Sequence, residues 1–303
     1  MDRNILVLGG AGFIGTNLCN KLVDSNKVIS VDVRKSPKLN SEVIQFEKSF
    51  SEIDEINSII NNYHITHVIH CISTLLPRST LEDFYRDNNL VYNNTVSLLD
   101  SCVNKNINFI FLSSGGVLYE NSDLSHKEND ALNPLSFYAL SKLNIENLIH
   151  YYGSKYNLNY LIIRPSNPYG FGQRIDGKQG LISTILGKVL NDETLEIWGD
   201  GEDVRDYLFI DDFVIAVDKL IKREIMNTCV NIGSGVGYSV NEVIQIVEKC
   251  IGKKINVKYT NNILAVKKNV LDITYLKQLI DFTPENLAMG VKIFYEKLKD
   301  DKQ

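Results

Sequence analysis

Apolar residues in the first 165 positions fall into short runs that are separated by longer stretches with a helical repeat. The runs are rich in Val, Ile and Phe, as in strands that are buried on both faces of a sheet. The longer stretches place apolar residues on one side of a helix. The predicted strands cover residues 5–8, 27–32, 43–46, 67–71, 109–112 and 160–163, and the predicted helices cover about 13–23, 52–62, 81–105 and 136–155.

Strands and helices that alternate in this way predict an α/β fold class, a doubly wound parallel sheet of the Rossmann type. After Pro165 the pattern changes, because glycines crowd into the segment 170–180 and shorter elements follow. We interpret residues 1–165 as a Rossmann domain and 166–303 as mainly a smaller mixed α/β C-terminal lobe, interleaved with the first. The later elements are predicted as helices near 181–190, 211–222, 239–251 and 284–299, and strands at 196–198 and 229–232.

Composition excludes several classes of function. The chain of 303 residues has a net charge of −5, so no basic field attracts nucleic acid or an anionic membrane. It has no run of about 18 apolar residues, which argues against a membrane span. No signal peptide precedes the first strand, and the cysteines are scattered, which argues against disulfides and a metal site and predicts a cytoplasmic protein. The five cysteines are Cys19, Cys71, Cys102, Cys229 and Cys250.

A glycine-rich turn joins the first predicted strand to the first predicted helix. Its sequence from Gly9 to Gly15 is Gly-Gly-Ala-Gly-Phe-Ile-Gly. Glycines allow a tight turn and a close approach of the backbone to a pyrophosphate, and the N–H groups of the helix N-terminus attract its negative charge. Glycine-rich turns are often plain loops, but this position between strand and helix predicts a dinucleotide site. The predicted contacts are Gly9, Gly12, Phe13, Ile14 and Gly15.

The second predicted strand ends at Asp32, 17 residues after Gly15. An acid at this place can accept both ribose hydroxyls of NAD, and it repels the 2′-phosphate of NADP. A solvated carboxylate at a strand end is the alternative. Arg34, two residues further on, would allow some tolerance of NADP, but NAD is the predicted cofactor.

Tyr138 and Lys142 are spaced by four residues in a predicted helix, so that they share one face. A phenol has a pKa near 10 and is a poor base at neutral pH. The Lys142 ammonium and the positive ring of bound NAD⁺ favour the phenolate, and a lowering by about 3 units corresponds to about 4 kcal/mol. We therefore predict Tyr138 as the base that takes a proton from a sugar hydroxyl while hydride leaves its carbon.

With these residues the chain resembles the extended short-chain dehydrogenase/reductase family, and closely its NAD-dependent epimerase/dehydratase members of the UDP-glucose 4-epimerase type. The resemblance covers nearly the whole chain, and several motifs occur in the right order. It is carried by Gly9–Gly15, His70–Thr74, Ser113–Tyr119, Tyr138 with Lys142, Arg164–Gly170, Trp198–Gly201, Arg205–Tyr207, Ile210–Asp212 and Asn231–Gly235.

The resemblance implies a role for further residues. Cys71, Ile72 and Ser73 line the cofactor, and Pro165 lies under the nicotinamide, so that 1–165 is the NAD-binding domain and 166–303 the nucleotide-sugar lobe. Asn167 and Arg205 contact the diphosphate region of the substrate, and a Ser or Thr after the fifth strand contacts the reacting hydroxyl. A homodimer that pairs the helices near 81–105 and 136–155 is also implied.

Ordinary structural roles compete with some of these assignments. Asn167 alternatively caps a turn beside Pro168. Arg205 alternatively pairs with Asp206 or Asp211 as surface charge. For His67 and His70, which flank a buried strand, we expect core packing and not catalysis.

The sequence departs from the family pattern in three places. Gly115 stands where relatives carry the catalytic Ser or Thr, so Ser114 is our candidate, with Ser113 as the alternative. The segment Glu47–Phe50 lacks an Asp that recognises adenine in many relatives. The segment 261–266 has neither the Arg nor the Asp that hold the nucleotide in relatives, so we expect weaker binding or a nucleotide other than UDP.

Three functions are compatible with these residues. Gly116 and Val117 stand where dehydratases and decarboxylases carry acids, so we do not expect those reactions. Epimerisation of a UDP-hexose at C4, in polysaccharide biosynthesis, is the main prediction, and reduction of a nucleotide 4-keto sugar by NAD(P)H is the alternative. A non-catalytic regulator that binds NAD or a sugar nucleotide is a third hypothesis. Tyr138 and Lys142 argue against it, because a protein that only binds these ligands does not need a catalytic base.

Overall fold

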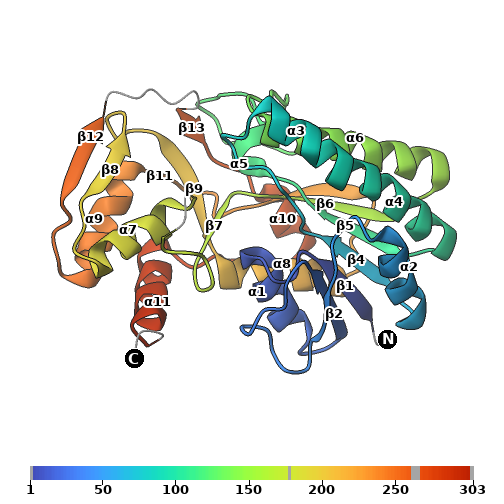
Figure 1. Ribbon diagram of the computed structural model, residues 1–303. Helices are drawn as coiled ribbons and strands as arrows, with labels where there is room; N and C mark the ends of the chain where they lie inside the picture. Colours follow the sequence, from blue (N-terminus) through green and yellow to red (C-terminus); the bar gives the residue numbers. More distant parts are fainter. Residues whose placement is uncertain (1–2, 177–178, 261–266, 301–303) are drawn as a thin grey trace. The chain divides into compact units, whose positions relative to one another are not determined.

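The computed structural model describes residues 3–176, 179–260 and 267–300, and divides them between two compact units (Figure 1). Unit 1 consists of Met1–Leu118, Leu132–Arg164 and Val217–Val230, and unit 2 of Tyr119–Ala131, Pro165–Ala216 and Asn231–Gln303. The chain therefore passes between the units several times. Which unit binds which ligand remains a prediction.

A seven-stranded sheet forms the centre of unit 1. Its order is β10-β6-β5-β4-β1-β2-β3, and the neighbours from β6 to β3 pair in parallel. The order turns back at β1, which lies between β2 and β4, and ligands of doubly wound sheets bind at such a point. The predicted fold class is confirmed. The strands are β1 Asn4–Leu8, β2 Lys27–Asp32, β3 Ile44–Glu47, β4 His67–His70, β5 Asn108–Leu112, β6 Tyr160–Pro165 and β10 Thr228–Ile232.

Helices cover both faces of this sheet. On one face α2, α4 and α6 pack beside one another, and α1 lies on the other (Figure 1). The core between the sheet and the first group is mainly apolar and includes Leu6, Val68, Leu98, Phe109 and Ile145. The helices of unit 1 are α1 Phe13–Leu22, α2 Ile53–Asn62, α3 Leu81–Asp87, α4 Asn93–Lys105, α5 Gly115–Leu118 and α6 Phe137–Tyr156.

The segment 81–105 is helical throughout but is not the single α-helix that the sequence predicts. A π-helical turn, Asn88–Tyr92, lies between α3 and α4. The extra residue in such a turn rotates the helix that follows, and π turns occur frequently near functional sites. Here the turn begins directly after Asp87, which is buried.

Unit 2 contains shorter strands in a mixed arrangement, as the sequence predicts for the C-terminal lobe. β9 is its central strand, which pairs antiparallel with β11 and parallel with β7 and β13, while β8 pairs with β12. Most of these strands are too short for a pattern to indicate them. The elements are β7 Asn167–Tyr169, α7 Leu181–Leu190, β8 Leu195–Trp198, β9 Val204–Phe209, α8 Ile210–Lys222 (which continues into unit 1), β11 Gly237–Ser239, α9 Val240–Ile251, β12 Val257–Thr260, β13 Lys268–Asn269, α10 Thr274–Leu279 and α11 Leu287–Asp300.

Within the described residues, no helix combines the length and the apolar character that a membrane span requires. Nor do three or more His, Cys, Asp or Glu side chains of these residues gather where a metal ion could be held.

Candidate active site

The glycine turn has a backbone that larger residues cannot adopt. Gly9 has a φ of +81°, and a Cβ added at Gly15 would lie only 2.1 Å from the Gly9 carbonyl oxygen. Gly12 begins α1 without a side-chain cap, and the first turn of α1 carries no acidic residue. The N–H groups of this turn are therefore suited to an anion such as a pyrophosphate.

Three other predicted cofactor contacts, Asp32, Cys71 and Ile72, lie against the same turn. Asp32, at the end of β2, accepts a hydrogen bond from the Ala11 N–H through Oδ2 at 3.0 Å. A Cβ at Gly9 would lie 3.3 Å from both the Cys71 carbonyl carbon and the Ile72 nitrogen, so the segment after β4 packs against the turn. These residues converge beside β1, where the strand order turns back, and they fit a dinucleotide.

The segment that follows β4 continues this surface. Burial raises the pKa of the Cys71 thiol to about 12. The thiol is therefore protonated at neutral pH, so Cys71 can line the surface but is not a nucleophile. Ser73 is exposed, and its hydroxyl donates to the Leu75 carbonyl oxygen at 3.3 Å. Thr74, the next residue, donates through Oγ1 to Asp87 Oδ1 at 2.6 Å.

Tyr138 and Lys142 lie on the first turns of α6. Ser136 caps this helix by accepting the Ala139 N–H at 3.2 Å. The buried Lys142 Nζ donates to the Leu112 carbonyl oxygen at 2.8 Å and lies 6.0 Å from the centroid of the Tyr138 ring. The lysine is thus held at the end of β5, and Tyr138 is only half-buried, as a base that meets a substrate must be.

The structure distinguishes the two candidate serines after β5. The Ser114 hydroxyl interacts with the Tyr138 phenol and acts to lower its pKa. Ser113 Oγ is buried and has no hydrogen-bond partner among the residues that the structure describes. Gly115, which replaces the usual hydroxyl-bearing residue, begins the short helix α5. Ser114 therefore lies where a hydroxyl can contact both Tyr138 and a reacting group.

Burial changes the ionisation of the Tyr138–Lys142 pair. It raises the pKa of Tyr138 above its usual value, and the hydrogen bond with Ser114 opposes this rise. Burial also lowers the pKa of Lys142 to about 8, so the lysine is still mostly an ammonium at neutral pH. The cations invoked to favour the phenolate, Lys142 and the NAD⁺ ring, must therefore overcome a desolvation cost that the sequence does not show.

The two predicted diphosphate contacts belong to unit 2 and occupy neighbouring strands. Asn167 in β7 is paired with Tyr207 in β9, and its Nδ2 donates to the Asp206 carbonyl oxygen at 2.8 Å. Arg205 precedes Asp206 on β9, two residues from Tyr207 and so on the same face of the strand. Asn167 thus has a contact within the sheet, and not merely the turn cap that was the alternative.

Arg205 contacts backbone carbonyl groups at the start of β9. Its Nη1 donates to the carbonyl oxygens of Val204 at 2.8 Å and of Lys267 at 3.4 Å, and it is half-buried. Asp206 instead accepts hydrogen bonds from Ser234, Gly235 and Leu271, and Asp211 pairs with Lys297. Burial lowers the pKa of Arg205, which remains a cation at neutral pH.

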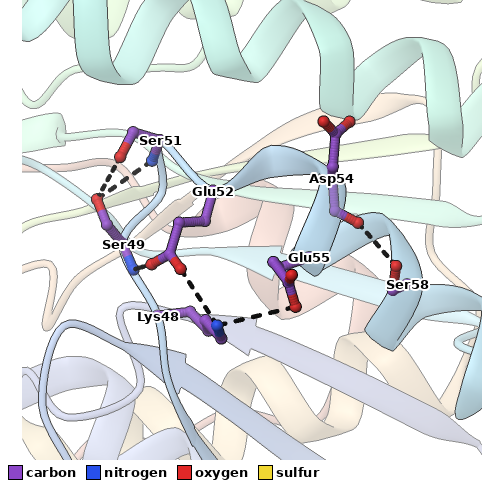
Figure 2. Close-up of polar contacts among 7 residues, drawn as sticks. All are labelled: Lys48, Ser49, Ser51, Glu52, Asp54, Glu55 and Ser58. Atoms are coloured by element: carbon purple, nitrogen blue, oxygen red, sulfur yellow. Dashed lines mark hydrogen bonds and ion pairs between the residues drawn. The ribbon is translucent and has the colours of Figure 1, made fainter.

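The segment in which relatives carry an adenine-binding Asp is folded onto the start of α2. Figure 2 shows Glu52 accepting the Ser49 N–H at 2.7 Å and pairing with Lys48 at 3.2 Å. Lys48 also reaches Glu55 at 3.8 Å, and the hydroxyls of Ser49 and Ser51 are 2.8 Å apart. The single cation Lys48 is shared by two carboxylates, so this segment keeps a net negative charge.

The sequence analysis assigned no role to Glu146, Arg164 or Asp87, which are buried charged residues of unit 1. Arg164 forms a bidentate, buried ion pair with Glu146 at 3.1 and 2.6 Å, which ties α6 to the end of β6 immediately before the buried Pro165. The spacing of Glu146 from Lys142, one further helical turn, is the signal that would have indicated it. Asp87 gave no such local signal.

His67 and His70, for which the sequence favoured core packing over catalysis, are buried in unit 1. His70 is fully buried between aromatic rings and hydrogen-bonded to Thr95 at 3.2 Å, so it is a packing residue, and His67 is buried as well. The segment 261–266, which lacks the nucleotide-binding residues of relatives, lies outside the described residues.

Comparison with known proteins agrees with this geometry. The model of the NAD dependent epimerase/dehydratase family matches residues 5–233, which includes the glycine turn, Tyr138, Lys142 and Arg205. The chain belongs to this family. It is therefore an NAD-dependent enzyme of nucleotide-sugar type, as predicted, and the third hypothesis of a non-catalytic regulator is not needed.

Individual relatives differ in their reactions. The chain is 34% identical over 262 residues to the dTDP-4-dehydro-6-deoxyglucose reductase of Escherichia coli. The aligned region covers 83% of each chain. It is 31% identical over 310 residues to the UDP-glucuronate 4-epimerase of Thermodesulfobacterium geofontis. This aligned region covers 95% of this chain and 93% of the relative. The crystal structure of Thermotoga maritima UDP-glucose 4-epimerase with UDP-glucose superimposes with a TM-score of 0.92 at 29% identity, over 99% of this chain and all of that one.

Proposed function

We propose that this enzyme is a nucleotide-sugar 4-epimerase of the UDP-hexose type, with NAD as the cofactor. The observation that carries the proposal is the arrangement in unit 1 of Tyr138, Ser114 and Lys142. The Ser114 hydroxyl acts to lower the pKa of the phenol, and the Lys142 ammonium is one helical turn away. The same unit holds the glycine turn and Asp32, which fit the dinucleotide.

The proposed reaction begins with proton transfer from the C4 hydroxyl of the hexose to the Tyr138 phenolate. NAD⁺, when bound, would supply the acceptor for the C4 hydride and, once reduced, the donor for its return. Ser114 donates a hydrogen bond to the C4 oxygen, and Lys142 holds positive charge near the phenolate. The 4-keto sugar then turns over within the site, and hydride returns to its other face while Tyr138 gives the proton back. Gly115 and Gly116 leave room for this rotation.

The substrate's nucleotide end is assigned to unit 2. We propose that Arg205 forms a charge-assisted contact with the diphosphate and that Asn167 donates a hydrogen bond to the same region. A cation placed there is needed because the net charge of −5 provides no general attraction for an anion.

A second candidate function is the reduction of a nucleotide 4-keto sugar. The 34% identity to a dTDP-4-dehydro-6-deoxyglucose reductase favours it. The same side chains serve in this reaction, with Tyr138 as the acid that protonates the C4 oxygen as hydride arrives. The enzyme then consumes reduced cofactor in each cycle and releases it oxidised.

Purified protein with UDP-galactose and no added cofactor tests the proposal. We expect UDP-glucose to form, and a Tyr138→Phe protein that folds normally should lose this activity. Conversion of dTDP-4-keto-6-deoxyglucose that depends on NADH or NADPH, without interconversion of UDP-hexoses, would contradict the epimerase and support the reductase. Mass spectrometry of ligands released from fresh protein identifies the retained cofactor and nucleotide.

We also propose that two copies associate through α3, α4 and α6. Exposed aromatic and aliphatic side chains on α3 and α6 support this arrangement, because such residues on a helix face often mark an interface. They are Leu81 and Tyr85 on α3, and Tyr151 and Tyr156 on α6.

A further inference from the structure

Asp87 is a buried carboxylate at the end of α3 that the proposed reaction does not use. Only 1% of its surface is exposed. Its Oδ1 accepts a hydrogen bond from Thr74 Oγ1 and its Oδ2 one from Ser141 Oγ, both at 2.6 Å. Thr74 belongs to the segment that leaves β4 along the cofactor surface, and Ser141 directly precedes Lys142 on α6.

We propose that Asp87 is a positioning residue of this active site, which fixes the catalytic helix α6 to the cofactor-lining segment after β4. Short hydrogen bonds from two hydroxyls to one ionised acceptor are stronger than neutral ones. They connect α3, α6 and the segment 71–74 at a single point. The π turn that starts after Asp87 is consistent with this role, since π turns tend to occur at functional sites.

The second part of the role is electrostatic. A buried carboxylate is costly unless positive charge compensates it, and Lys142 provides that charge. In return, Asp87 acts against the effect of burial and keeps the pKa of Lys142 from falling further. The other ionisable groups that face Lys142 are Cys71, His70, Tyr138 and Glu146.

These neighbours leave Asp87 as the carboxylate with most effect on Lys142. Glu146 is already paired with Arg164, Cys71 is a neutral thiol, and His70 is neutral because burial lowers its pKa to about 3. Without Asp87 we therefore expect Lys142 to lose its proton at a lower pH. The ammonium that favours the Tyr138 phenolate would then be absent at mildly alkaline pH.

The test is the pH dependence of cofactor affinity, measured by calorimetric titration of nucleotide-free protein with NAD⁺. The Lys142 ammonium repels the positive nicotinamide ring, so the affinity for NAD⁺ should change near pH 8 in the unaltered enzyme. NADH, whose ring carries no charge, is the reference ligand. In Asp87→Asn protein we expect this inflection to move to lower pH by about one unit, as for the loss of a nearby charge.

Two matched variants separate position from charge. Glu82→Gln removes a negative charge from the exposed side of the same helix and should leave the inflection unchanged. Asp87→Glu keeps the charge and should restore an inflection near that of the unaltered enzyme. A role confined to stability would lower the melting temperature and the fraction of binding-competent protein without moving the inflection.

The inference rests on the proposed Tyr138–Lys142 chemistry, but its test needs no sugar. An inflection in Asp87→Asn protein equal to that of the unaltered enzyme overturns the role of Asp87 and leaves the proposed function intact. A flat NAD⁺ profile in the unaltered enzyme overturns the electrostatic role of Asp87 and the assumed proximity of Lys142 to the nicotinamide ring, whereas the proposed function is tested separately with UDP-galactose. If Asp87→Asn protein does not fold, a Thr74→Val, Ser141→Ala double variant replaces it. It releases the carboxylate, and an inflection that does not move down overturns the proposal.

Discussion

At the scale of single residues, the arrangement of the active site depends on which serine hydroxyl, that of Ser113 or that of Ser114, lies beside the Tyr138 phenol. Two adjacent serines follow β5, and they are chemically equivalent in the sequence. The fold makes them different, because the Ser114 hydroxyl acts on the Tyr138 phenol while Ser113 Oγ is buried without a partner among the described residues. Residue type alone could not make this choice, which depends on the direction of each side chain at the strand end.

Alanine substitution of each serine tests this assignment. We expect Ser114→Ala to lower kcat by about 100-fold, the effect of removing one hydrogen-bond donor to a developing oxyanion. Ser113→Ala should leave kcat within a few-fold of the unaltered enzyme, since it removes a hydroxyl that meets no described partner. Steady-state kinetics with melting curves for both proteins measure the difference. A larger loss in Ser113→Ala would reverse the assignment.

Elements with a strong local pattern could be predicted, and those held by distant contacts could not. The parallel strands and the glycine turn follow from runs of apolar residues and from glycine spacing, which are local properties. The partners of Asp87 lie 13 and 54 positions away in the sequence, so nothing near it indicates its burial. β9 was missed for a related reason, because its polar residues are buried by hydrogen bonds that unit 2 supplies, as for Asp206.

The attachment of α6 to β6 gives a prediction at this scale. Glu146→Ala removes the carboxylate that pairs with the buried Arg164 guanidinium, and breaking a buried pair in this way costs about 3–5 kcal/mol of unfolding free energy. Urea denaturation measures the change. Asp176→Ala, which breaks the exposed pair with Arg174, is the control and should leave the unfolding midpoint unchanged. Equal effects of the two substitutions would show that the buried pair does not secure α6.

At the scale of the whole molecule, buried neutral histidines set the response to acid. Burial lowers the pKa of His70 to about 3 and that of His67 to about 4, from an ordinary value of 6.5. Between those values and 6.5 the unfolded chain binds more protons than the folded one, so stability is lost as the pH falls through this window. The slope is up to about 1.4 kcal/mol per pH unit for each histidine.

Denaturation in urea at several pH values between 4 and 7 tests this dependence. We expect the unfolding free energy to decrease below pH 6.5, and His70→Leu protein to show a shallower slope, whatever its absolute stability. His64→Asn is the control, because His64 is exposed and asparagine accepts its positive φ of 48°. A slope in His70→Leu protein as steep as in the unaltered protein would assign the acid sensitivity to other groups.

Exposed aromatic side chains on α6 support the proposed association of two copies. Tyr151 and Tyr156 on α6 are 54% and 46% exposed, and their rings are 5.9 Å apart, so they form one apolar surface. Burying a large aromatic side chain between two copies is favourable, whereas burying a carboxylate there is strongly unfavourable. We therefore expect Tyr151→Glu protein to elute as a monomer in size-exclusion chromatography with light scattering, at concentrations at which the unaltered protein is a dimer. Tyr259→Glu, on the exposed strand β12 of unit 2, introduces the same charge and should leave the dimer intact, and a dimer that survives Tyr151→Glu must use another surface.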